Sequence, residues 1–122
     1  MLVSADKVAG LSAPVSSVPP MAMFTVTMVN GPHWDSSRQR RAQPAWTEHA
    51  AFMEQLVDDG FVILGGPIGD GAMVLLAVEA KDDSEIKARF DQDPWIPMGV
   101  IQIGTIAPWT IWLDGRERVR TR

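Results

Sequence analysis

Hydrophobic residues recur along the first half of the chain with spacings that predict a strand and a helix. Residues Met23 to Asn30 are β-branched, apolar or aromatic, which is typical of a strand. Asn30-Gly31-Pro32 favours a turn, and the polar, arginine-rich residues 33–43 predict a loop. Pro44 suits the first position of a helix. One apolar stripe at helical spacing follows it before Gly60 ends the helix, made of Ala45, His49, Phe52, Met53 and Leu56.

The second half of the chain repeats the alternation of strands and a helix. Two apolar runs, 61–64 and 73–78, predict strands joined by a hairpin loop over the glycine-rich residues 65–71. Asp82-Asp83-Ser84 opens a second helix, which has Ile86 and Phe90 on one face and ends before Asp93-Pro94. Residues 100–106 predict a fourth strand, with residues 109–113 as its extension.

The predicted order β-α-β-β-α-β is that of a ferredoxin-like α+β fold. In this fold two helices cover one face of a four-stranded antiparallel sheet. A sheet with one wet face alternates apolar and polar residues, yet the second and third predicted strands are apolar on both faces. Because the helices cover one face only, we expect a second copy of the chain to cover the other, giving a homodimer.

The two ends differ from the body in composition. Residues 1–22 are rich in serine and proline without a steady apolar period, and we expect a flexible leader. Residues 23–113 form the predicted domain. Residues 114–122 carry four of the eleven basic residues and are expected to be a solvated basic tail. The leader lacks a signal peptide's positive start and continuous apolar run, which favours a cytoplasmic location.

The amino-acid composition excludes several kinds of site and argues against several kinds of partner. The chain has 122 residues and a mass of 13.4 kDa, which corresponds to one domain. It has no cysteine, so disulfides, thiolate metal sites and a cysteine nucleophile are excluded. A net charge of −4 argues against a nucleic-acid partner. No stretch approaches the ~18 consecutive apolar residues of a membrane-spanning helix, so we expect no membrane partner.

Several familiar motifs are absent or occur in the wrong context. The two histidines, His33 and His49, do not form a His-Glu-x-x-His pair, so we expect no metal. The glycine-rich run 65–71 joins two predicted strands, whereas a phosphate-binding loop opens a helix, so we expect no nucleotide or other cofactor. A Gly-x-Ser-x-Gly elbow is also missing.

His49 is the residue most suggestive of chemistry. It lies on the inner stripe of the first predicted helix, where a histidine is either a satisfied core residue or a catalyst. Asp93 follows the second helix, which lies beside the first in the predicted fold. The two side chains then form a pair in which the carboxylate fixes the imidazole tautomer, as general acid–base catalysis requires. In the alternative, Asp93 caps the turn before Pro94.

These features together resemble the YCII-related (YciI-like) family of ferredoxin-like proteins. The resemblance rests on His49 in Trp46-Thr47-Glu48-His49, on Gly65-Gly66-Pro67 and on Asp93-Pro94-Trp95, and it covers roughly residues 23–113. It implies a dimeric α+β barrel in which two sheets face each other, and a pocket with His49 and Asp93 as the active-site pair. One family member is a dehydrochlorinase, and many have no assigned reaction. The leader and the segment 31–35 depart from the family pattern.

On the same basis we assign supporting groups. Trp46 and Trp95 flank the pair and would form stacking walls, Gly66 would let a strand approach a ligand, and Arg41 would meet an acidic substrate group. The alternatives are packing for the tryptophans and solvation for Arg41.

Three functional hypotheses follow. The first is a cofactor-independent lyase or isomerase that uses His49 and Asp93 on a small, cyclic or aromatic, oxygenated substrate. The second is a dimeric module of the same family that binds a small molecule without turnover. The third is a cofactor-free monooxygenase, since such enzymes use a similar paired-sheet architecture.

Overall fold

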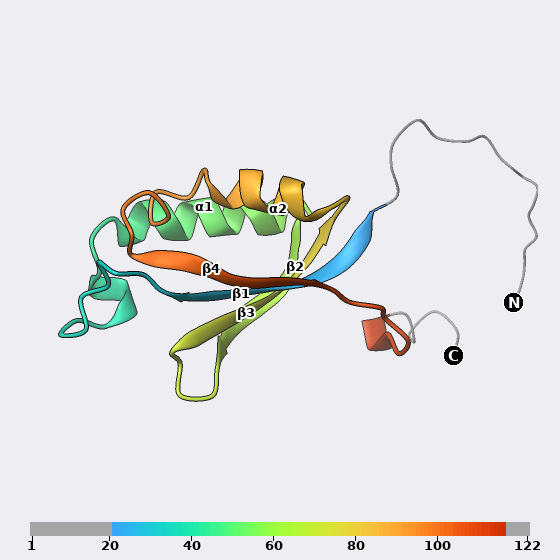
Figure 1. Cartoon of the computed structure of the whole chain (residues 1–122), viewed down its shortest axis with the longest axis horizontal. Helices are drawn as coiled ribbons and strands as arrows, with labels where there is room; N and C mark the ends of the chain where they lie inside the picture. The colour runs from blue at the N-terminus through green and yellow to red at the C-terminus, as the bar shows by residue number, and fades with distance from the viewer. Residues whose placement is uncertain (1–20, 117–122) are drawn as a thin grey trace, which may run out of the picture.

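The computed structural model describes residues 21–116, which form a four-stranded antiparallel sheet with two helices (Figure 1). The strands lie in the order β2-β3-β1-β4, and both helices cover the same face of the sheet. The predicted α+β class is therefore confirmed. The elements, in chain order, are β1 (Ala22–Asn30), the short 3-10 helix η3 (Arg40–Ala42), α1 (Trp46–Asp58), β2 (Val62–Ile68), β3 (Met73–Ala80), α2 (Asp83–Phe90) and β4 (Ile101–Pro108).

The core lies between the helices and the sheet. Strand β1 alternates along its length: Phe24, Val26 and Met28 are buried, and the residues between them are half-buried. This alternation places one set of side chains under the helices and the other on the opposite face. The helices contribute Leu56, Ile86 and Phe90, and each of these side chains is almost completely buried. The apolar stripes predicted for both helices are thus confirmed for these residues.

Helix α2 begins as its sequence predicts. Asp82 precedes its first turn, and the Asp82 carboxylate accepts a hydrogen bond from the Glu85 backbone N–H at 2.9 Å. This bond satisfies one of the backbone donors that a helix start leaves free. The helix ends at Phe90, three residues before Asp93.

Helix α1 begins differently from the prediction. Pro44 does not open the helix, because the first helical residue is Trp46. Ala45, between them, has a φ of 60° in the left-handed region, and no side chain caps the helix start. The Pro44 carbonyl instead accepts a hydrogen bond from the indole N–H of Trp95 at 2.6 Å. A long-range hydrogen bond is thus present immediately before the start of α1.

The β2–β3 hairpin also differs from the prediction. Strand β2 continues through Gly65-Gly66-Pro67 to Ile68, so these residues pair with β3 and do not form the hairpin loop. The turn lies at Gly69–Ala72, where two glycines have positive φ values of 60° and 91°. The extension predicted over residues 109–113 is absent, because β4 ends at Pro108.

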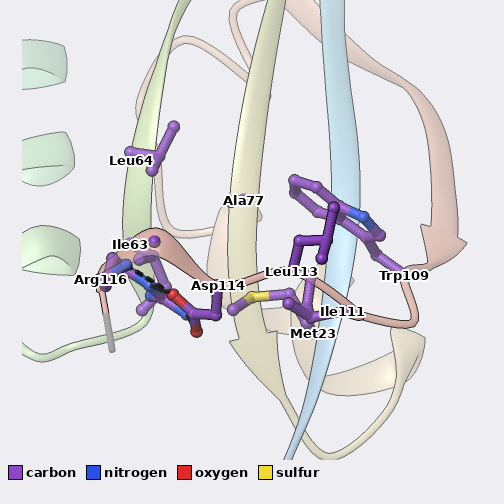
Figure 2. Close-up of a pocket in the computed structure, with 10 residues that line it drawn as sticks. Met23, Ile63, Leu64, Ala77, Trp109, Ile111, Leu113, Asp114 and Arg116 are labelled. Atoms are coloured by element: carbon purple, nitrogen blue, oxygen red, sulfur yellow. Dashed lines mark hydrogen bonds and ion pairs between the residues drawn. The ribbon is translucent and has the colours of Figure 1, made fainter. Parts of the chain in front are cut away.

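The sheet face opposite the helices is largely apolar at its β2 and β3 side. The large hydrophobic residues exposed there are Leu64, Ile68, Met73 and Trp109. Leu64 is the most exposed of these four, with 63% of its surface accessible. The segment after β4 folds back here. In Figure 2, Trp109, Ile111 and Leu113 gather beside Met23 of β1 around a cavity of about 160 Å³.

Most of the predicted leader, residues 1–20, and most of the predicted basic tail, residues 117–122, lie outside the described residues. Asp114 and Arg116, at the start of that tail, form an ion pair at 2.7 Å and line the same cavity as Trp109. Among residues 21–116, no helix is long and apolar enough to cross a membrane.

Gly31 provides a test of the packing around the loop before η3. Its backbone N–H donates to the Val100 carbonyl at 2.8 Å, and a methyl group on Gly31 would overlap the Gly99 carbonyl. We expect Gly31→Ala to lower the free energy of unfolding by about 1–3 kcal/mol, the usual cost of forcing atoms into a packed site.

Gly66→Ala is the matched control, because a methyl group there meets no atom within 4 Å. We expect a change within about 0.5 kcal/mol, as for ordinary surface substitutions. Urea unfolding of both variants measures the difference. Equal stability of the two variants would contradict the packing described around Gly31.

Candidate functional site

The site is built on a contact between α1 and the loop that follows α2. His49 Nδ1 lies 2.7 Å from Asp93 Oδ2. The His49 side chain is 10% exposed and that of Asp93 is 0% exposed. The predicted pairing of the two residues is therefore present, and it is buried. Since an ionised carboxylate can only accept hydrogen bonds, we assign Nδ1 as the donor to Asp93.

Both carboxylate oxygens of Asp93 are engaged. Oδ2 accepts from His49, and Oδ1 accepts from the Trp95 backbone N–H at 2.9 Å. The turn-capping role that was the alternative for Asp93 is thus combined with the pairing role. Two fixed donors hold the carboxylate in one orientation, and the carboxylate in turn holds the imidazole.

Trp95 fixes the plane of the imidazole ring. The two rings stack with centroids 3.8 Å apart and planes 8° from parallel. Trp95 is completely buried, and its indole N–H is held by the Pro44 carbonyl. Trp46 lies 5.8 Å from the His49 ring at a tilt of 49°. Both tryptophans predicted to flank the pair are therefore beside it, and Trp95 also belongs to the core.

The other imidazole nitrogen of His49, Nε2, is free. It makes no hydrogen bond to any described residue, whereas every fully buried polar side-chain atom in residues 21–116 has a partner. Nε2 must therefore be open to the space beside it. His49 lines a cavity of about 40 Å³, together with Met28, Arg40, Met53, Val74, Leu76 and Ile101. A neutral imidazole that donates from Nδ1 presents a lone pair at Nε2, which can accept a proton.

Two of the predicted supporting residues lie elsewhere. Gly66 pairs with Leu75 and lines a cavity with it, whereas the neighbouring Leu76 lines the His49 cavity. Consecutive strand residues point to opposite faces, so Gly66 is on the far side of the sheet from His49. Arg41 is exposed and lies over the Trp46 ring at 5.9 Å, outside the residues that line the cavity.

Sequence reasoning missed two residues of this region. Arg40, which is half-buried, lines the His49 cavity in the place expected of Arg41. Gln43 is buried. Its side-chain oxygen accepts a hydrogen bond from the Asp35 backbone N–H, and its side-chain NH₂ group donates to the backbone carbonyls of Asp35 and Arg38. Gln43 thereby holds the loop that presents Arg40. Neither residue follows a periodic pattern, so the sequence offers no signal for them.

Residues 21–116 contain no cluster of three or more histidine, aspartate or glutamate side chains that could hold a metal ion. Comparison with protein-family models, with curated proteins and with solved structures finds no significant match to this chain. The family resemblance is therefore carried forward as a proposal that rests on the residues themselves.

Asp93→Asn tests the tautomer that the geometry predicts. The asparagine carbonyl must face the Trp95 N–H, because that donor needs an acceptor, so the amide NH₂ then faces His49 Nδ1. We expect the imidazole proton to move from Nδ1 to Nε2. Ring ¹⁵N chemical shifts of His49, assigned with His49→Gln, would report this change. An unchanged pattern in Asp93→Asn would contradict the orienting role of Asp93.

Proposed function

We propose that the protein is a cofactor-independent acid–base enzyme of the lyase or isomerase type. The observation that carries this proposal is a buried histidine that lines a cavity, whose Nδ1 is fixed by a carboxylate at 2.7 Å and whose Nε2 has no partner among the described residues. This is the arrangement needed to move a proton at one defined atom.

The chemistry follows from that arrangement. In the elimination of HCl, Nε2 of His49 takes a proton from a ring carbon, the C–H electrons form the new double bond, and chloride leaves with the C–Cl electrons. In an isomerisation, Nε2 returns the proton at another carbon. Asp93 stabilises the imidazolium in either case. The substrate proposed from the family resemblance is small, cyclic or aromatic, and oxygenated.

Two observations support the proposed ferredoxin-like fold and YCII-related family. The strand order β2-β3-β1-β4, with both helices on one face, is compatible with the split β-α-β arrangement. The pairing of His49 with Asp93 falls on the two residues that the resemblance names as the active-site pair. The family assignment nevertheless remains our proposal.

A screen of small oxygenated ring compounds, including chlorinated ones, tests the activity. For any compound that the wild type converts, we expect His49→Gln and Asp93→Asn each to lower kcat/KM by about 10²–10⁴-fold, the usual contribution of a positioned acid–base group. Chromatography of the products, with chloride release as a second readout, measures the rates. Full activity in either variant would remove that residue from the mechanism.

A module that binds a small molecule without turnover is the second candidate. It is favoured by the lining of the cavity, where five of the seven residues are apolar and the other two are His49 and Arg40. A ligand that binds at this cavity and is recovered unchanged would favour this candidate. The third hypothesis, a monooxygenase, has no observation in its favour here.

We also propose that the chain forms a homodimer through the open sheet face. The exposed apolar side chains there are Leu64, Ile68 and Trp109, which line one cavity, and Met73, which pairs with Ile68. An apolar surface of this kind usually marks an interaction site. Two sheets packed through this face would form the dimeric barrel that the family resemblance implies.

Leu64→Lys tests the dimer, because it places a charge in the middle of this face. We expect the wild type to scatter light as twice 13.4 kDa and Leu64→Lys as a single chain. Val57→Lys is the matched control: Val57 is 53% exposed, but on α1, away from the sheet. A single-chain mass for the wild type at micromolar concentration would overturn the dimer.

A cytoplasmic location is the last part of the proposal. The absence of cysteine is compatible with a reducing compartment, where disulfides are rare. No structural observation bears on this point, so the location stays a prediction from the sequence.

A further inference from the structure

The Arg40 side chain occupies an unusual position beside the proposed acid–base pair. It is half-buried and lines the same cavity as His49. Its guanidinium lies 5.1 Å from the centroid of the Trp34 ring. Its guanidinium makes no hydrogen bond or ion pair with any described residue, so its N–H donors have no acceptor within residues 21–116.

Three of the other four arginines in residues 21–116 find acceptors, and the fourth, Arg41, is exposed and lies over the Trp46 ring. Arg89 pairs with Asp59 at 2.9 Å, Arg116 pairs with Asp114 at 2.7 Å, and Arg38 donates to the Ala42 carbonyl at 3.2 Å. Burial lowers the pKa of Arg40, which reflects the loss of water around its charge. A guanidinium that has lost water without gaining an acceptor is suited to bind an anion.

We propose that Arg40 binds the carboxylate of the substrate and that the substrate is therefore a small carboxylic acid with an apolar body. This inference rests on the proposed function, since it places the bound molecule beside His49. The cavity offers one cation together with the apolar side chains of Met28, Met53, Val74, Leu76 and Ile101. One guanidinium matches one carboxylate through two parallel hydrogen bonds.

A phosphate ester fits this site less well. It carries a charge of about −1.5 to −2 at neutral pH. Arg40 is the single cationic side chain among the residues that line the cavity, with His49 committed to Asp93 through Nδ1. A monoanion therefore matches the charge of the site better than a phosphate does.

The size of the cavity limits how the substrate enters. A volume of about 40 Å³ holds about three water molecules at ~10–15 Å³ each. We therefore place the reacting end of the substrate inside, near His49 Nε2. The carboxylate would lie at the opening, beside Arg40, which is more exposed than His49.

The loop that carries Arg40 is held in place by two sets of contacts. Trp34 packs edge-on against Trp95, with centroids 6.2 Å apart, and thus connects the surface under Arg40 to the wall of the site. Gln43 bonds Asp35 and Arg38 across the same loop. Arg40 is therefore positioned before a ligand arrives, which lowers the entropic cost of binding.

Matched pairs of probes test the inference. Benzoate, cyclohexanecarboxylate and 2-furoate are each compared with the corresponding neutral amide. Binding is followed by NMR through the His49 ring and Trp95 indole signals, in the wild type, Arg40→Gln and Arg41→Gln. Arg41→Gln is the control, because it removes the same charge one residue away from the cavity lining.

We expect at least one carboxylate to bind the wild type more tightly than its amide does. Arg40→Gln should weaken that binding about tenfold or more, as for the loss of a charge-assisted hydrogen bond. It should leave amide binding unchanged, and Arg41→Gln should retain carboxylate binding. No preference for any carboxylate over its amide in the wild type, or an equal loss in Arg41→Gln, would overturn the inference.

Binding measured in His49→Gln through the Trp95 indole signal alone separates this inference from the proposed function. Carboxylate binding that persists in this variant and depends on Arg40 would support the inference even if His49 proves not to be catalytic. Unfolding curves of Arg40→Gln and Arg41→Gln check that both variants fold. A loss of amide binding in Arg40→Gln would show a general distortion of the cavity and would also overturn the inference.

Discussion

The buried carboxylate of Asp93 is the constraint on which the rest of the site depends. Its two oxygens receive one hydrogen bond from α1, through His49, and one from the backbone of its own loop, at Trp95. Trp95 then binds the Pro44 carbonyl ahead of α1 and stacks on the His49 ring. A buried carboxylate is stable only while these donors are present, because leaving a buried acceptor without its partner costs about 1–3 kcal/mol, and more for a charged group. Asp93 therefore links the stability of the fold to the geometry of the site.

Much of the fold could be predicted from the sequence because it follows from periodicity. The alternation in β1 and the apolar stripes of the two helices, with Leu56 on α1 and Ile86 and Phe90 on α2, correspond to buried faces. The pairing of His49 with Asp93 was also predictable, since an inward position on one helix and a turn after the other bring the two side chains together. The predicted boundaries of strands and helices were wrong where local turn signals compete with the hydrogen-bonded pairing of strands. Gly65-Gly66-Pro67 reads as a turn but lies in β2, because β3 pairs with these residues.

The residues that escaped prediction lie where the chain has no period. Pro44 suits a helix start locally, yet its carbonyl is taken by Trp95, and the helix begins later. Arg40 and Arg41 are indistinguishable in the sequence, although only Arg40 lines the cavity of His49. That difference is decided by the short turn η3 and by Gln43, whose three hydrogen bonds hold the loop. A family resemblance based on the order of motifs cannot show which of these two neighbouring arginines lines the cavity.

The start of α1 has a consequence for how the site comes into existence. Ala45 adopts a left-handed conformation, which costs roughly 1–2 kcal/mol for a residue other than glycine. The helix start also has no side-chain cap. Its position is set instead by partners far along the chain, since Trp95 and Pro44 are 51 residues apart and His49 and Asp93 are 44 residues apart. Contacts of such long range form late and together, after the entropy of closing the chain has been overcome. We therefore expect the acid–base pair to be assembled only as α1 and the loop after α2 come together in the folded chain.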